Sequence, residues 1–188
     1  MDAETKMLVQ LADEEDWETR NKAFLLLIEA VNKKVDWAYE VWDKLVDDLS
    51  SSNMELRLRA GQLLSYLAIS DSEQRILEIF PEIWDITYDL DYESSLDLFQ
   101  STWKIGLAGA EQKNILFQAY EERFQETLKD SENNNELVRF YILKNLMKLY
   151  EQLQDKKTEN LIQKLLYLES ENRYKVNCQV YIQTYISR

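Results

Sequence analysis

The chain of 188 residues contains no histidine, one cysteine, one proline and three glycines. Without histidine it has no imidazole general base, no histidine-activated nucleophile and no histidine metal ligand. Cys178 is the single thiol, so it cannot close an internal disulfide or complete a four-cysteine zinc site, and we expect it to be small and buried. Gly61, Gly106 and Gly109 form neither a G-x-G-x-x-G motif nor a Walker loop. These absences predict a protein that is not an enzyme, with no catalytic residues and no cofactor.

Signals for membrane insertion and secretion are also missing. The longest aliphatic run, at residues 25–28, is far shorter than a membrane span. Residues 1–4 are acidic and lack the basic-then-apolar order of a signal peptide. Asp85 and Asp89 share a helix face, but two carboxylates without further ligands do not make a metal site. We therefore expect a cytoplasmic protein that holds no metal and does not contact a membrane.

The formal net charge of −13 is concentrated in the first half of the chain. Residues 1–97 carry 23 acids and 9 bases, whereas residues 98–188 carry 12 acids and 13 bases. The acids are densest at residues 13–16 and 71–97. Such a field disfavours nucleic acid and anionic lipid and favours a basic partner. The alternative is that these acids only keep a solvated surface soluble.

Helical periodicity dominates the sequence, and no segment shows convincing strand alternation or a hairpin turn. Apolar residues make up 45% of the chain, which is enough to form a core. The sequence therefore predicts an all-α fold.

One helical pattern recurs along the chain. It consists of a capping residue, an anchor four positions later, usually basic, and small or apolar residues at +3, +7 and +10 from the anchor. The anchors are separated by 37, 38, 44 and 36 residues. The five copies are Asp16, Arg20, Ala23, Leu27, Ala30; Asn53, Arg57, Ala60, Leu64, Leu67; Asp91, Ser95, Leu98, Thr102, Ile105; Asn135, Arg139, Ile142, Leu146, Leu149; and Glu171, Lys175, Cys178, Ile182, Tyr185.

The segments between these helices also match one another. Residues 40–47 align with residues 78–85 at an offset of 38, and residues 115–117 and 161–162 occupy the corresponding places later. Each repeat is therefore expected to be a helix pair, and a polar loop at residues 130–135 explains the longest interval. We predict one domain over residues 1–188, with approximate repeats at 1–33, 34–70, 71–108, 109–154 and 155–188. The alternative architecture is an irregular helical bundle.

The repeat resembles the HEAT repeat, a member of the armadillo-like α-solenoids. The resemblance rests on Leu56-Arg57-x-x-Ala60, on Val138-Arg139-x-x-Ile142 and on Pro81 within a first helix. Ser95 stands where the pattern has arginine. The resemblance implies an α-solenoid of about five stacked antiparallel helix pairs, whose second helices line a concave face and bind proteins.

On the second helices, the exposed line is expected at +2, +5 and +9 from each anchor. In the middle three repeats, the bases, amides and tyrosines on this line make a candidate partner-binding surface for a peptide or an acidic segment. The alternative is that they are ordinary solvated side chains. The candidate residues are Arg59, Gln62, Tyr66, Gln100, Lys104, Tyr141, Lys144 and Lys148.

Each tryptophan could likewise either pack in the core or contribute to a binding surface. Trp42 and Trp84 nearly coincide in the repeat frame and lie in apolar stripes, so we expect both to pack in the core. Trp103 adjoins Lys104 and could reach the candidate surface.

We expect a non-enzymatic protein–protein interaction module or scaffold. It would bind a protein, through a basic or peptide-like segment of that partner, at the concave face or at the acidic N-terminal half. One alternative is a relative of the HEAT-like DNA glycosylases, which the fold permits and the negative charge disfavours; its groove would hold Trp103, Asp97, Arg59, Lys104, Lys144 and Lys148. Another is an acidic immunity-type inhibitor or DNA mimic that covers a basic enzyme surface.

Overall fold

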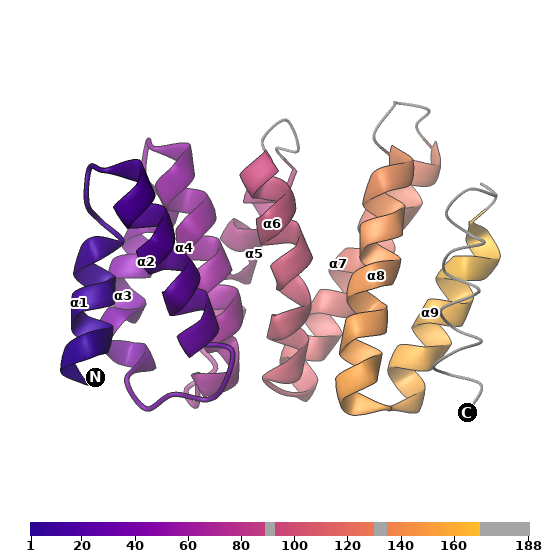
Figure 1. Ribbon diagram of the computed structural model, residues 1–188. Helices are drawn as coiled ribbons and strands as arrows, with labels where there is room; N and C mark the ends of the chain where they lie inside the picture. Colours follow the sequence, from indigo (N-terminus) through magenta and orange to yellow (C-terminus); the bar gives the residue numbers. More distant parts are fainter. Residues whose placement is uncertain (89–92, 130–134, 170–188) are drawn as a thin grey trace. The chain divides into compact units, whose positions relative to one another are not determined.

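A computed structural model describes residues 1–88, 93–129 and 135–169. These residues form nine α-helices and two 3₁₀-helices and no strand, so the all-α prediction is confirmed (Figure 1). Among them, no helix is long and apolar enough to cross a membrane. The chain divides into two compact units, an N-terminal unit (Met1–Ala108) and a C-terminal unit (Gly109–Arg188), which are described separately below.

The N-terminal unit contains the first six of these α-helices and both 3₁₀-helices. In chain order they are α1 (Ala3–Leu11), α2 (Trp17–Ala30), α3 (Ala38–Leu49), α4 (Met54–Leu67), η1 (Ala68–Ser70), α5 (Ile76–Ile86), α6 (Glu93–Ser101) and η2 (Thr102–Leu107). The C-terminal unit contains α7 (Ala110–Lys129), α8 (Asn135–Leu153) and α9 (Lys156–Leu168).

Short polar side chains begin several of these helices. The Asp16 carboxylate accepts a hydrogen bond from the backbone N–H of Thr19 (2.9 Å), and the Asn53 side chain accepts one from Glu55 (2.9 Å). Both residues therefore cap their helices as the repeat pattern predicts. Asn135 differs by one position, because it is the first residue of α8 rather than the residue before it. The expected caps at positions 91 and 171, and the thiol at position 178, lie outside the described residues.

Helix α4 is the centre of the N-terminal unit and lies against α2, α3, α5 and α6. In this unit, α2, α4 and α6 stand next to one another in a row (Figure 1), while α3 and α5 contact each other behind it. Gly61 permits the close approach of α4 and α6, because a Cβ atom there would lie 3.0 Å from Cδ1 of the fully buried Leu98. Helices α4 and α6 of this row are thus closely packed.

The two tryptophans expected in the core differ in burial. Trp42 on α3 is fully buried, as predicted. Trp84 on α5 is half-buried, and its ring lies 5.9 Å from that of Phe80 and 5.8 Å from that of Phe99 on α6. Pro81 lies inside α5, as the sequence predicts. Aromatic contacts therefore join α5 to α6.

A buried carboxylate joins α3 to the turn before α5. The Tyr39 hydroxyl donates to Oδ1 of Asp71 at 2.7 Å, and the backbone N–H of Ile76 donates to Oδ2 at 2.7 Å. Asp71 is 7% exposed. Burial, followed by the bond to Asp71, raises the pKa of Tyr39. This pair of bonds holds the connection into α5.

The C-terminal unit is built around α8, which contacts both α7 and α9. Tyr120 and Phe124 of α7 and Leu146 of α8 are fully buried in its core. The anchor Arg139 is also buried and binds Glu169, the residue that ends α9, with an Nε–Oε2 distance of 2.7 Å. Its Nη1 donates to the Thr127 carbonyl at 2.9 Å. One guanidinium thus ties the ends of α7 and α9 to α8.

Candidate functional site

The candidate surface residues divide between the two units. Those in the N-terminal unit lie on α4, α6 and η2, and those in the C-terminal unit all lie on α8. All are half-buried except Lys104, which is 9% exposed. The first group comprises Arg59, Gln62, Tyr66, Gln100 and Lys104, and the second comprises Tyr141, Lys144 and Lys148.

In the N-terminal unit, one stripe of α4 faces outward between α2 and α6. Glu55, Arg59, Gln62 and Tyr66 follow one another at intervals of three or four residues, so they share a helix face. All four are only half-buried, whereas the opposite stripe of α4 is buried. We call this stripe, together with the α2 and η2 side chains that touch it, the α4 face.

One end of the α4 face is built around Arg59. Its Nη2 lies 2.8 Å from the Glu55 carboxylate, which also binds Arg20 of α2 at 3.1 Å. The guanidinium lies 5.0 Å from the centroid of the Phe24 ring. Burial lowers the pKa of Arg59; Glu55 opposes this effect and Arg20 adds to it. The buried Nη1 atom of Arg59 has no hydrogen-bond partner among the described residues.

The other end of the α4 face is built around Lys104. Its ammonium donates to Oδ1 of Asn32 at 2.5 Å and lies 4.3 Å from the centroid of the Trp103 ring and 5.1 Å from that of Tyr66. Such distances allow cation–π attraction. Burial raises the pKa of Tyr66, and hydrogen bonding to Ser101 opposes it. The cation is therefore held between two aromatic rings and an amide.

Lys104 is more buried than the repeat pattern suggests. The +9 position is exposed only if the α-helix continues through it, but α6 ends at Ser101 and the chain continues as the 3₁₀-helix η2. A 3₁₀-helix has about 3 residues per turn, so residue 104 is rotated away from the exposed line. The same change of helix type brings Lys104 to Asn32, which follows α2.

Exposed apolar side chains border the α4 face on α2. Trp17 is 63% exposed and Leu25 is 57% exposed. Asn21 lies between them on the same face of α2, and its Oδ1 is 3.5 Å from Nη2 of Arg59. Sequence reasoning missed Trp17, Asn21 and Asn32. The repeat pattern held no signal for them, because the offset of 37 between the first two anchors aligns Lys22, and not Asn21, with Arg59.

In the C-terminal unit, α8 carries a second basic and aromatic stripe. The Lys144 ammonium lies 5.4 Å from the centroid of the Tyr141 ring, which packs edge-on against Phe140 at 5.4 Å. Burial and the neighbouring Lys144 lower the pKa of Lys148. This stripe resembles the α4 face in chemistry, but it belongs to a separate unit.

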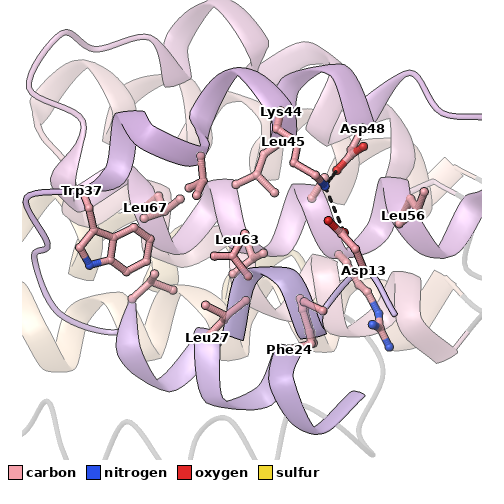
Figure 2. A pocket seen from close by; sticks show the side chains of 16 residues that line it. Asp13, Phe24, Leu27, Trp37, Lys44, Leu45, Asp48, Leu56, Leu63 and Leu67 are labelled. Carbon is pink, nitrogen blue, oxygen red and sulfur yellow. Dashed lines mark hydrogen bonds and ion pairs between the residues drawn. The ribbon is translucent and has the colours of Figure 1, made fainter. Parts of the chain in front are cut away.

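A small cavity lies among α1, α2, α3 and α4 of the N-terminal unit (Figure 2). Its lining is mostly aliphatic and aromatic, and Lys44 is one of the few polar side chains in it. The Lys44 ammonium lies 3.1 Å from the Asp13 carboxylate and 2.9 Å from the Asp48 carboxylate. The volume of the cavity is about 50 Å³. An apolar cavity that binds benzene measures about 150 Å³, so this one is too small for such a ligand.

The described part of the chain contains no group of three or more Asp, Glu or Cys side chains placed to hold a metal ion. The α4 face gathers the Arg59 and Lys104 cations, the Glu55 carboxylate, side-chain amides and aromatic rings, which suit the binding of a polar chain. The sequence matches no family model and no curated protein, and no solved structure matches the fold.

Proposed function

We propose that this chain is a short HEAT-like solenoid that binds another protein and catalyses no reaction. Two arrangements support a repeated helix pair. Within the N-terminal unit, α2, α4 and α6 follow one another in contact, as do α3 and α5. The anchor Arg20 of one pair binds Glu55 of the next pair at 3.1 Å. Repeats in such arrays contact their neighbours and leave one helix layer as an extended surface.

The observation that carries the binding function is the composition of the α4 face. Two large apolar side chains, Trp17 and Leu25, are more than half exposed there. They lie on α2, whose Asn21 contacts Arg59, and the segment that follows this helix contacts Lys104 through Asn32. Exposed aromatic and aliphatic side chains beside arginine are typical of protein-binding hot spots, because a partner both removes apolar surface from water and satisfies the polar groups.

The test uses exposed side chains whose removal leaves the core intact. The full chain is immobilised, proteins from the native host are captured, and the partner is purified for measurement of its Kd. We expect Trp17→Ala and Leu25→Ser each to raise this Kd about tenfold or more, because hot-spot truncations cost more than about 1.4 kcal/mol. Tyr167→Ala is the matched control, since Tyr167 is 87% exposed on α9 of the other unit. An unchanged Kd in both α2 variants would refute the use of the α4 face.

A second candidate surface is acidic and lies on the neighbouring helices α3 and α5. Its exposed carboxylates occur at three- or four-residue intervals on each helix, so each set shares a face. A basic protein segment would complement this surface. The carboxylates are Glu40, Asp43 and Asp47 on α3 and Glu78, Glu82 and Asp85 on α5.

Charge reversal separates this second candidate from the first. Asp43→Lys combined with Glu82→Lys should slow association of a basic partner, most steeply at low ionic strength, because electrostatic steering is screened by salt. The same variant should leave a partner of the α4 face unaffected. Association rates that do not respond to the charge reversal at low salt would rule out the acidic surface.

A further inference from the structure

We propose that a cavity between α4 and α5 receives an arginine side chain from a basic segment of a partner protein, and that Glu82 and Asp85 bind its guanidinium group. This inference rests on the proposed protein-binding function and deepens its second, acidic surface. It names the side chain that this surface recognises and the place where that side chain enters.

The cavity lies in the N-terminal unit, where the end of α3 and the start of α4 meet the second half of α5. Its volume is about 380 Å³. Sites for small ligands measure about 300–1,000 Å³, so there is room for one long side chain. Leu49 of α3, Met54 of α4 and Ile86 of α5 supply apolar lining, which would cover the methylene groups of an arginine.

Charged side chains on two walls of the cavity do not neutralise one another. Glu82 and Asp85 lie one turn apart on α5, so they share a face, and both are exposed. Neither carboxylate makes an ion pair or a hydrogen bond among the described residues. On the α4 wall, the half-buried Arg57 donates from Nη2 to the weak acceptor Sδ of Met54 at 3.2 Å and forms no ion pair among the same residues. Both carboxylates are therefore available to a cation from outside.

The ends of two helices add negative charge at the same place. Helices α3 and α5 contact each other and end at the cavity, at Leu49 and Ile86. A helix C-terminus carries about half a negative elementary charge and is stabilised by a nearby cation. Neither helix has a basic residue in its last turn, and α5 has Asp85 there instead. A cation from a partner would supply the positive charge that both helix ends lack.

The chemistry of the cavity favours arginine over lysine. Two carboxylates one turn apart offer several acceptor oxygens, and a guanidinium group has five donors in a planar fork, whereas an ammonium group is a compact and strongly hydrated charge. The Nε atom of Arg57 is sealed from solvent, so only its terminal nitrogens can meet a ligand. They would donate to a backbone carbonyl of the inserted segment. A small cation without a carbonyl would leave them without this acceptor, so a protein segment fits better.

Acidic side chains continue along both helices beyond the cavity. Asp43 and Asp47 on α3 and Glu78 on α5 are exposed. They would attract further basic residues of the same segment. Residues 1–97 carry 23 acids against 9 bases, so the field of the chain also draws a basic segment from a distance. Charge complementarity thus selects a basic occupant at long range, and the cavity selects its arginine at short range.

The experiment titrates the full chain with a short synthetic peptide that has a lysine near each end and one variable central residue. The central residue is arginine, lysine or citrulline, which keeps the shape of arginine but has no charge. Binding is followed by fluorescence polarisation at about 0.15 M salt, where long-range attraction is screened. We expect the arginine peptide to bind about tenfold or more tightly than the citrulline peptide, because charge-assisted hydrogen bonds are lost. It should also bind more tightly than the lysine peptide.

Variants of the two carboxylates then locate the arginine. In the double variant Glu82→Gln with Asp85→Asn, the arginine and citrulline peptides should have the same Kd, because the coupling between the charges is gone. Glu78→Gln is the matched control, since it removes the same charge one turn earlier on α5 and does not line the cavity. It should keep the preference for arginine. Arg57→Met should weaken the citrulline peptide, which presents a carbonyl but no charge for Arg57 to repel. Circular dichroism checks that each variant is folded.

Equal affinity for the arginine and citrulline peptides would overturn the proposal. So would a preference for arginine that survives the double variant, or one that Glu78→Gln abolishes as completely. A lysine peptide as tight as the arginine peptide would overturn the choice of arginine, and an unchanged Kd in Arg57→Met would remove Arg57 from the site. Free arginine amide that competes at the Kd of the peptide would show a site for a small cation instead of a segment.

None of these results decides the proposed function. Its acidic surface fails only if the association of a purified basic partner does not respond to Asp43→Lys combined with Glu82→Lys. A partner that responds to this charge reversal but is indifferent to Glu82→Gln and Asp85→Asn would refute the present inference alone.

Discussion

The buried ion pair between Arg139 and Glu169 predicts that replacing either residue alone lowers stability much more than replacing both together. The two side chains are 7% and 2% exposed and meet at 2.7 Å and 3.4 Å through Nε and Nη2. Arg139→Met and Glu169→Met each remove one partner and leave the other charge buried. Arg139→Met also removes the hydrogen bond that Arg139 donates to the Thr127 carbonyl at the end of α7, so this variant disturbs all three helices of the C-terminal unit.

The expected magnitude follows from the cost of an unpaired buried charge. Removing one partner of a buried ion pair costs about 3–5 kcal/mol of unfolding free energy. The double variant with methionine at both positions leaves no buried charge and fills similar space, so we expect it to lie within about 2 kcal/mol of the wild type. The coupling energy between the two sites is then about 4 kcal/mol or more. Lys156→Met, which breaks an exposed pair with Glu159 on α9, should cost less than about 1 kcal/mol.

The measurement is urea unfolding followed by two probes. All five tryptophans lie in the N-terminal unit, so tryptophan fluorescence reports that unit, whereas far-ultraviolet circular dichroism reports helices in both units. The single variants should shift the dichroism transition to lower urea. A double variant as destabilised as the sum of the two single variants would refute the reasoning, because it would show that the two side chains do not act as a pair.

Three further predictions concern stability. Tyr39→Phe removes the hydroxyl that donates to the buried Asp71, and we expect a loss of about 1–3 kcal/mol in unfolding followed by tryptophan fluorescence; an unchanged Tm would contradict this. Gly61→Ala places a Cβ 3.0 Å from Leu98. The resulting crowding of α4 against α6 should outweigh the gain in helix propensity and lower the urea midpoint of unfolding. A higher midpoint would show that the Leu98 side chain moves aside at little cost. Burial alone would raise the pKa of Asp155, but hydrogen bonds from the cap of α9 and its ion pair lower this pKa overall. Its stabilisation is therefore fully present above an unfolded pKa of about 3.9 and is lost as the pH falls through the folded value, so Asp155→Asn should lower Tm at about pH 7 and lower it less as the pH falls below about 3.9; an effect that does not shrink with falling pH would contradict this.

Much of the helix layout could be predicted from local chemistry. Asp16 and Asn53 cap α2 and α4 where expected, because a short polar side chain satisfies the free backbone N–H groups whatever lies further away. The apolar stripe that contains Leu64 and Leu67 is buried as the helical period requires. Trp42 is likewise buried where its stripe places it.

The site residues could be predicted less well. The expected line of exposed positions assumes unbroken α-helices, and it reached Arg59, Gln62 and Tyr66 because α4 is continuous through them. The prediction of an exposed position is wrong at Lys104, because α6 ends at Ser101 and Lys104 lies in a 3₁₀-helix. Asn32 lies beyond the end of α2, so helical spacing does not point to it, although it is bound to Lys104, 72 residues away in sequence.

The sequence by itself determined the helical fold class, the capped helix starts and the separation of an acidic first half from a nearly neutral second half. These features depend on local hydrogen bonds, on the helical period and on composition, which neighbouring residues encode. Only the tertiary structure decided which polar side chains meet. Arg20 reaches Glu55, Lys104 reaches Asn32 and Arg139 reaches Glu169 because helices distant in sequence pack side by side. Burial makes the Arg139–Glu169 contact strong, since the same two charges in water would interact weakly.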